Sequence, residues 1–414
     1  MRLLYINTHG FTGGHHITYS HAIVSEAIRR GWIVDFAVTD EALRHGGIRG
    51  TVEMACQSGG TVIEIKAIST LLPGRLGLLE GQIKRWALVH KAWVKARKIV
   101  RSDAIYVVDC DGWMGLAAVI GLPASGPPLI SLSNQARVHR PAGSRVLSPT
   151  RLGYQLRLSI LERFLTRTHP AKVFCLEESL PRTMLLRTGG GSNRLAHLEE
   201  LGQGPDLLDK SQARKALDLN PNCQYICCFG GEVRKGVLAL LRALTADIWP
   251  EKFGVILLGD PDSTVESELL EPACKTLMAG NRLKVFRGYY DAAKQSLVLS
   301  ASDAVWLGYQ RFYASSAVLC EAAQAGVPVL GTPLGWIGDR VPKSGIGLVV
   351  EPQDVAAVVR CLRLLMEPGA EREKFVSNCY VEGRKHTQTL FGATVCDAII
   401  ETTRTNSAPL AGTI

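Results

Sequence analysis

The feature that most constrains the fold of this chain is an alternation of short apolar runs and helical segments that occurs twice along the chain. In the first half the apolar runs that predict strands are 3–7, 32–38, 61–68, 104–108, 129–132 and 173–176. In the second half they are 224–229, 254–258, 283–286, 304–307, 327–330 and 347–350. Because parallel strands need long crossover connections, usually helices, this alternation predicts α/β structure with a parallel sheet in each half.

Glycine-rich loops and one interruption define the predicted domain organisation. The first strand of each half is followed by a glycine-bearing loop, at 8–14 and at 230–236. At 414 residues the chain is long for one core, and glycine and proline interrupt both patterns near 201–205. The predicted parts are a first domain at 1–201, a second at 205–385, a helix at 386–403 and a flexible tail at 404–414.

The positive charge of the chain is concentrated in one segment. The net charge is +9, and residues 81–170 hold fourteen Lys and Arg against four Asp and Glu. Such a segment suits an anionic partner, which is a membrane surface, a lipid-linked phosphate or nucleic acid. No recognised nucleic-acid motif accompanies these charges, so we expect no nucleic-acid partner.

The cysteines and the apolar runs of the sequence predict the cellular compartment of the protein. The eleven cysteines are scattered and include no CxxC pair, which predicts reduced thiols and no zinc. No window offers the roughly 20 apolar residues of a membrane helix, and the first apolar run is too short for a secretion signal. We therefore expect a cytoplasmic protein, peripheral at the inner face of the membrane where the basic segment touches lipid.

The segment from Ser315 to Gly347 carries the strongest functional signal. Ser315 and Ser316 are suited to cap a helix that contains Glu321 and stops at Gly326, after which a short buried strand begins. A helix start with exposed amides beside a buried strand is a place to hold a phosphate. Taken alone, the segment also fits a helix–strand unit of any parallel α/β protein.

In this segment the chain resembles the family-4 glycosyltransferases, whose signature is a glutamate, seven residues, a second glutamate, then Ala, Gly, Pro, Val and a glycine-rich turn. Glu321 takes the place of the second glutamate, and Tyr313 stands where the first is expected. The resemblance implies the GT-B architecture of two Rossmann-like domains in tandem with a cleft between them. It also implies a retaining transfer of a hexose-type sugar from a nucleotide diphosphate to a glycan or lipid-linked acceptor, without metal or cofactor. The helix at 386–403 would cross back to the first domain.

The resemblance assigns roles on the donor side. Lys235 matches the family lysine that contacts the diphosphate, with Arg234 beside it, although the family arginine after the strand glycine is absent. The amides of Ser316, Ala317 and Val318 would form the second phosphate contact, Glu321 would accept from the ribose hydroxyls, Tyr313 would touch the sugar, and Tyr289 would stack on the base. An ordinary surface lysine and a plain helix glutamate are the alternative interpretations of Lys235 and Glu321.

On the acceptor side, the resemblance places Gly13, Gly14 and His15 near the donor phosphate and the acceptor. Asp109 and Asp111 lie where many family members have a sugar-contacting histidine, and they also resemble the Asp-x-Asp metal motif of a different glycosyltransferase fold. Two further functions stay open. One is a protein that binds a nucleotide sugar without turnover, and the other is a nucleotide-sugar epimerase.

Overall fold

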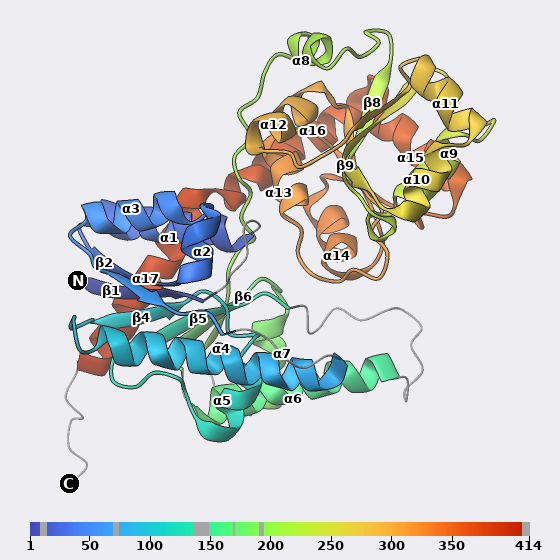
Figure 1. Cartoon of the computed structure of the whole chain (residues 1–414). Coiled ribbons are helices and arrows are strands. Elements are labelled where there is room, and N and C mark those ends of the chain that lie inside the picture. Colours follow the sequence, from blue (N-terminus) through green and yellow to red (C-terminus); the bar gives the residue numbers. More distant parts are fainter. Residues whose placement is uncertain (9–14, 69–73, 136–148, 169, 190–193, 408–414) are drawn as a thin grey trace. The chain divides into compact units, whose positions relative to one another are not determined.

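The computed structural model describes residues 1–8, 15–68, 74–135, 149–168, 170–189 and 194–407. Its contacts divide the chain into two compact units (Figure 1). Among the described residues, the N-terminal unit contains those up to Glu199 and the last helix from Gln388, and the C-terminal unit runs from Glu200 to Thr387.

The N-terminal unit is built on a parallel sheet. Its strands are β1 (Arg2–Asn7), β2 (Ile33–Thr39), β3 (Val62–Ile65), β4 (Ala104–Val107), β5 (Leu129–Ser133), β6 (Lys172–Cys175) and β7 (Leu195–His197). Its helices are α1 (His15–Arg29), α2 (Asp40–His45), α3 (Arg49–Gln57), α4 (Gly74–Ala96), α5 (Met114–Ile120), α6 (Pro149–Arg167), α7 (Leu180–Arg187) and α17 (Gln388–Ser407). The strands lie in the order β3-β2-β1-β4-β5-β6-β7 and every described pair is parallel.

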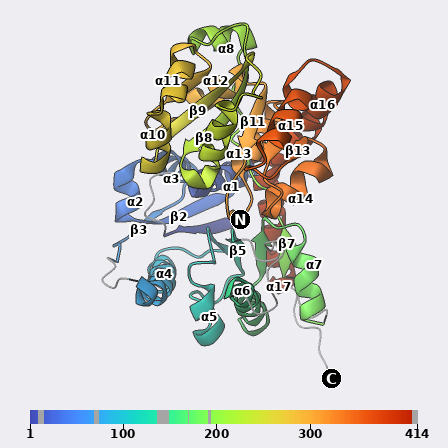
Figure 2. The same ribbon diagram turned by 90° about the vertical axis from the view of Figure 1, so that its right-hand side faces the viewer.

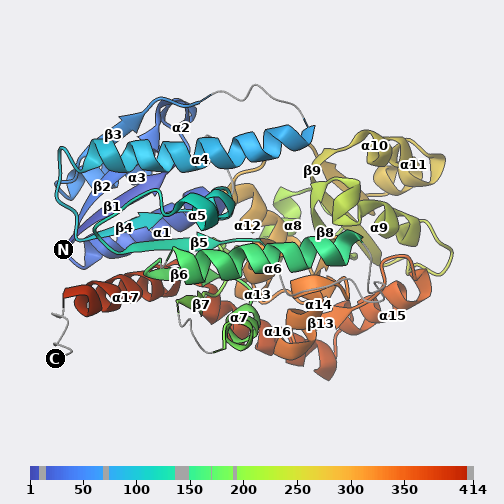
Figure 3. The ribbon, with the colours of Figure 1, turned by 90° about the horizontal axis from the view of Figure 1, so that it is seen from below.

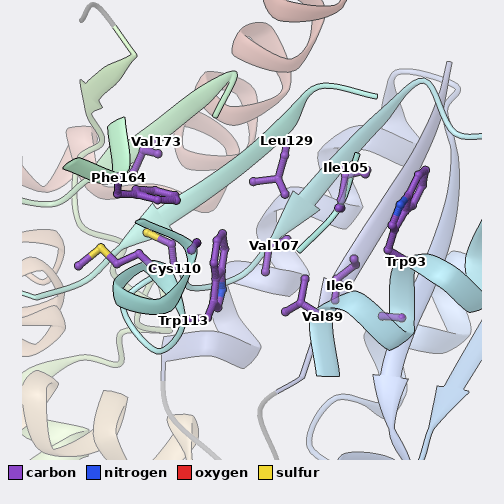
Figure 4. Close-up of a cluster of buried hydrophobic side chains, with 14 of the residues drawn as sticks. Ile6, Val89, Trp93, Ile105, Val107, Cys110, Trp113, Leu129, Phe164 and Val173 are labelled. Carbon is purple, nitrogen blue, oxygen red and sulfur yellow. The ribbon is translucent and has the colours of Figure 1, made fainter. Parts of the chain in front are cut away.

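Helices α4, α5 and α6 cover one face of this sheet and run side by side (Figure 3). The core beneath them joins Ile6, Ile105 and Val107 of the strands to Val89 and Trp93 of α4, Trp113 beside α5 and Phe164 of α6 (Figure 4). Val89 and Trp93 are spaced as one face of a helix, and this face of α4 lies against the sheet.

Helix α17 packs on the opposite face, against α1. The rings of Tyr19 and Phe391 stack with centroids 4.9 Å apart, and Arg30 pairs with Asp397 at 2.6 Å. A Cβ on Gly392 would lie 2.4 Å from the carbonyl oxygen of Ala22, so only glycine permits this close approach. The helix ends at Ser407, four residues beyond the end that the sequence predicts.

The C-terminal unit contains a second parallel sheet. Its strands are β8 (Gln224–Gly231), β9 (Phe253–Pro261), β10 (Leu283–Phe286), β11 (Ala304–Leu307), β12 (Val329–Gly331) and β13 (Gly347–Val349). Its α-helices are α8 (Lys210–Ala216), α9 (Val237–Leu244), α10 (Ser263–Leu269), α11 (Pro272–Ala279), α12 (Ala292–Ala301), α13 (Ala317–Gln324), α14 (Gly335–Ser344), α15 (Val355–Met366) and α16 (Ala370–Gly383). Short 3₁₀ helices are η1 (Val233–Lys235) and η2 (Arg384–His386). The strand order is β10-β9-β8-β11-β12-β13, and Figure 2 shows β9, β8, β11 and β13 in this succession.

Strand β8 shows why strands of this sheet can appear in the sequence as continuous apolar runs. Tyr225, Cys227 and Phe229 enter the core on the side of α12 and α13, whereas Ile226 and Cys228 enter the core on the side of α9 and α15. A strand covered on both faces has no solvent side, so its apolar residues do not alternate with polar ones. The predicted fold class, two α/β units with parallel sheets, is confirmed.

No helix among the residues described combines the length and the apolar character that crossing a bilayer requires. All eleven cysteines are free thiols, and all but Cys56 are buried or half-buried.

Candidate functional site

In the C-terminal sheet, the strands that follow β8 in the chain lie first on one side of it and then on the other. The chain adds β9 and β10 on one side of β8 and then places β11 on the other. In open parallel sheets, ligands bind outside the carboxyl ends of the strands at this switch point. A ligand site is therefore expected at the loops that follow β8 and β11.

These two loops are locked together by glycines. Gly236 has φ +76°, and a Cβ there would lie 2.0 Å from the carbonyl oxygen of Gly308. The indole of Trp306 donates to the carbonyl of Gly236 at 3.2 Å. The start of α9 is thus fixed against the end of β11, and any larger residue at 236 would separate them.

Lys235 lies at this junction, half-buried. Its Nζ donates to the hydroxyl of Tyr309 at 3.0 Å and lies 4.3 Å from the centre of that ring. The Lys235 side chain also crosses Gly230, where a Cβ would approach it within 3.1 Å. Arg234 differs from its neighbour because its guanidinium is exposed and lies 5.6 Å from the ring centre of Phe312. The switch point therefore holds one ordered cation, Lys235, with Arg234 outside it.

Helix α13 begins just after the β11 loop, at Ala317. Ser316 occupies the N-cap position, but its side chain forms no capping hydrogen bond. The hydroxyl of Ser315 donates instead to Oε2 of Glu200 at 2.5 Å. The predicted capping by both serine hydroxyls is therefore wrong: Ser316 forms no cap bond, and the hydroxyl of Ser315 is directed to the carboxylate of Glu200. The amides of Ala317 and Val318 have no acceptor in the described part of the chain, as expected at a helix start.

Tyr313 is held through its backbone by the start of α14. Its carbonyl accepts from the amide of Trp336 at 3.1 Å. A Cβ on Gly335, which has φ +65°, would lie 2.4 Å from the Cα of Tyr313. The residue that replaces the expected glutamate thus stands on a fixed loop between β11 and α13.

Glu321 is buried in the middle of α13, with 3% of its surface exposed. Its carboxylate accepts from the side-chain amide of Gln295 and from the backbone amide of Gln203. A cavity of about 20 Å³, which is room for one water, adjoins it. Gln295 and Gln203 thus donate to the carboxylate to which the ribose hydroxyls are predicted to donate. The predicted role of Glu321 in ribose binding stays a prediction.

The pH dependence of stability should report the burial of Glu321. Burial raises its pKa to about 7, with the charge of Glu200 adding to the effect against the hydrogen bonds from Gln203 and Gln295. The folded chain therefore holds this proton more tightly than the unfolded chain. Stability should fall as pH rises from about 4.5 to about 7, by about 3 kcal/mol from this group. Glu321→Gln should remove that decrease in urea unfolding, and identical pH slopes in both proteins would contradict the assignment.

A cavity of about 540 Å³ lies beside the loop that follows β10. Tyr289 lies at the edge of this cavity and is 92% exposed. The planes of the Tyr289 and Tyr290 rings are within 18° of parallel. Lys294 places its Nζ 4.1 Å from the ring centre of Phe286. An exposed flat ring beside a cavity of this volume is suited to stacking on a planar ligand.

The N-terminal sheet has its own switch point, between β1 and β4. Gly13 and Gly14 lie outside the described residues. His15 is the first residue of α1, and its side chain is not described. Of the residues predicted on the acceptor side, the structure therefore places the side chains of Asp109 and Asp111, directly after β4.

These two aspartates form a buried pair with different environments. Asp111 accepts from the hydroxyl of Ser133 at 2.7 Å and from the amide of Asn134 at 2.6 Å. Asp109 accepts from the amide of Asp111 and lies 3.8 Å from the guanidinium of Arg85. Burial, together with the charge of Asp111, raises the pKa of Asp109 to about 8. Asp111 also accepts from the amide of Gln135 and so orders the loop after β5. No cluster of three or more His, Cys, Asp or Glu side chains placed for a metal occurs within the described residues.

The structure adds residues to both switch points that the sequence did not single out. Arg85 reaches Asp109 from α4, and a Cβ on Gly112 would collide with its side chain. Gln295 reaches Glu321 from α12. Both partners are distant in sequence, and no local motif links them.

Comparison with known proteins bears on the C-terminal unit first. Residues 223–367 match the family model described as glycosyl transferases, group 1. The matched segment contains β8 to α15 and with them Lys235, Tyr309 and Glu321. No curated protein sequence matches the chain.

Solved structures resemble the whole chain. Anabaena HepE in complex with UDP superposes with a TM-score of 0.64 at 17% identity, over 97% of this chain and 100% of that one. Sucrose-phosphate synthase from Thermosynechococcus elongatus gives 0.68 at 16% identity, over 98% and 99%. WaaG, a glycosyltransferase involved in lipopolysaccharide biosynthesis, gives 0.59 at 16%, over 96% and 99%. The chain has the GT-B fold, two Rossmann-like domains in tandem.

Proposed function

We propose that this protein is a glycosyltransferase that moves a hexose-type sugar from a nucleotide diphosphate donor to a glycan or lipid-linked acceptor. The proposal includes retention of the anomeric configuration and chemistry without metal or cofactor, as the family resemblance implies. The observation that carries it is the switch point of the C-terminal unit. There an ordered lysine and free helix amides occur within a segment that matches a glycosyltransferase family model.

The chemistry of the reaction explains why these groups matter. Cleavage of the sugar–phosphate bond leaves additional negative charge on the departing diphosphate. Lys235 would stabilise that charge as a cation, and its position is already fixed by Tyr309. The amides of Ala317 and Val318, at the positive end of α13, would bind the same group without any proton transfer.

The base would lie in the cavity beside β10, with Tyr289 stacked against it. The solved HepE structures contain UDP and UDP-glucose, which makes uridine diphosphate sugars the first donors to test. The exposed basic residues of the segment 81–170, among them Lys91, Lys98 and Arg157, would draw the N-terminal unit to an anionic membrane surface that presents a lipid-linked acceptor.

The experiment that tests the proposal is a thermal-shift screen against nucleotide diphosphates and their sugars, followed by measurement of diphosphate release with and without acceptor. A ligand that binds the folded state raises the melting temperature by mass action. We expect a nucleotide diphosphate sugar to do so and to be consumed. A chain that is stabilised by none of these donors would overturn the proposal.

Glu321→Gln should weaken donor binding by about 1–3 kcal/mol, the range for a hydrogen bond to a charged group. The amide keeps the size of the carboxylate but accepts through one oxygen only, so it cannot hold two vicinal hydroxyls equally well. Calorimetry with the stabilising donor measures the effect, with Glu373→Gln on the exposed face of α16 as control. Wild-type affinity in the Glu321 variant would mean that the carboxylate faces protein partners only.

One observation favours a second candidate, a nucleotide-sugar-binding protein without turnover. Tyr313 replaces the glutamate expected at the sugar, and Glu321 is engaged by Gln295 and Gln203. Donor binding without diphosphate release would support this candidate over the transferase.

A further inference from the structure

A cavity of about 580 Å³ opens in the N-terminal unit at the amino-terminal ends of strands β5, β6 and β7. The switch point lies at the opposite, carboxyl ends of the strands. Its wall includes Leu129 at the start of β5, Ala171 just before β6 and Arg194 just before β7. Because the strands are parallel, these starting ends are as far along the strands as possible from the carboxyl ends that hold Asp109 and Asp111. The cavity is therefore separate from the candidate site.

Two guanidinium groups from different elements line this cavity. Arg167 is the last residue of α6, and Arg194 leads into β7. In the described part of the chain neither has a carboxylate partner, and no acidic residue is among those lining the cavity. Glu401, which precedes the lining residue Thr402 on α17, pairs instead with Lys172 at 3.7 Å. The cavity therefore presents two uncompensated positive charges.

One part of the wall is apolar and fixed in place, whereas Ser125, Thr168, Thr402 and Thr405 add hydroxyl groups elsewhere. Leu122, Ala124, Pro127 and Pro128 come from the segment between α5 and β5. Helix α4 holds this segment through two hydrogen bonds, in which Trp86 donates to the carbonyl of Gly121 at 2.9 Å and His90 contacts the carbonyl of Pro123 at 2.8 Å. A preformed wall of this kind costs little ordering when a ligand binds.

We propose that this cavity binds an organic phosphate, with its phosphate group between Arg167 and Arg194 and its carbon skeleton against Leu122, Pro127 and Pro128. Planar guanidinium groups match the geometry of phosphate oxygens and stay charged at every accessible pH. The volume lies in the range of small-molecule sites, and the apolar wall gives the carbon part of such an ester a surface that inorganic phosphate does not use. The ligand is either a free phosphate ester or the headgroup of a phospholipid, which share this chemistry.

The test measures binding of glycerol 3-phosphate to the full chain by calorimetry at low ionic strength. Vesicles of phosphatidylcholine with and without phosphatidic acid form a second arm, assayed by co-sedimentation. We expect Arg167→Gln and Arg194→Gln each to weaken binding about tenfold, from the loss of a charge-assisted hydrogen bond. Arg49→Gln, on α3, changes the same net charge outside the cavity and should leave binding unchanged. The Lys235→Ala variant should also keep it, since its substitution lies in the other unit.

Saturable binding of glycerol 3-phosphate that the two cavity variants lose would identify a free phosphate ester as the ligand. Binding only to vesicles with phosphatidic acid, lost in the same variants, would identify a lipid headgroup. Binding that Arg49→Gln weakens equally, or that inorganic phosphate matches in affinity, would overturn the proposal. Arg167→Lys, which keeps the charge but not the planar fork, serves if a glutamine variant fails to fold, and should still bind several-fold more weakly than wild type.

Discussion

Replacing Lys235 with alanine should lower turnover at saturating donor at least tenfold, and by up to about a thousandfold if Lys235 is the main electrostatic contact of the leaving diphosphate. The ammonium group is held 3.0 Å from the hydroxyl of Tyr309, so its position is set before any donor arrives. A preorganised cation stabilises the charge that develops during bond cleavage more than the charge already present in the bound donor. The loss should therefore appear mainly in kcat, and less in KM.

Two variants control this experiment. Arg242→Ala removes an exposed cation from the same helical region and should leave kcat unchanged. Lys235→Arg keeps the charge and should recover part of the rate. Because the Lys235 side chain also crosses Gly230, the melting temperature of each variant must be compared, so that a folding defect is not taken for a chemical one. Wild-type kcat in a stably folded Lys235→Ala protein would remove Lys235 from the reaction.

The strands of the C-terminal sheet could be predicted from sequence because burial on both faces makes them unbroken apolar runs. The expected strand at 304–307, whose residues are all buried and apolar, coincides with β11. Strand β7 was missed because, unlike the equally short β12 and β13, its three residues end in His197 and do not form an apolar run.

The candidate site could be predicted only where it is local in sequence. The β8–α9 loop and the start of α13 follow from glycines and from the order of strand and helix. The partners of Ser315 and Glu321 could not be predicted, because Glu200 and Gln203 lie more than a hundred residues earlier and reach α13 only through the fold. A serine before a helix predicts a cap, but the carboxylate of Glu200 directs the hydroxyl of Ser315 to itself, and no local pattern announces this partner.

A buried ion pair in the C-terminal unit leads to the largest expected change in stability. Arg340 of α14 and Glu382 of α16 meet with Nε and Oε1 2.5 Å apart, and their side chains are only 6% and 3% exposed. Lys385 donates to the other carboxylate oxygen at 2.8 Å, and His386 lies 3.2 Å from Oε1. Burial would raise the pKa of Glu382, but the hydrogen bonds from His386 and Lys385 and the charge of Arg340 hold it well below its usual value. The carboxylate is thus ionised in the folded protein.

Arg340→Met should therefore lower the free energy of unfolding by about 3–5 kcal/mol, because it leaves a buried carboxylate without its buried guanidinium partner. For a domain of this size the melting temperature should drop by roughly 6–20 °C. The pH dependence has a defined sign, since a carboxyl with a lowered folded pKa stabilises the protein above its unfolded pKa. That contribution is lost as pH falls below about 4.5, and the loss should be smaller in the variant. Differential scanning calorimetry across this pH range measures both effects.

The comparison that decides the origin of this effect uses two further variants. Lys385→Met removes a half-exposed partner of the same carboxylate and should cost less than about 1 kcal/mol, as solvent-screened pairs do. Arg340→Met combined with Glu382→Leu replaces the pair by apolar side chains and should recover most of the lost stability. If the double variant is as unstable as Arg340→Met alone, the loss comes from the packing of Arg340 against Trp336 and not from an unpaired charge. Only the charge explanation requires that removing the Glu382 carboxylate restore the stability that was lost when Arg340 was removed.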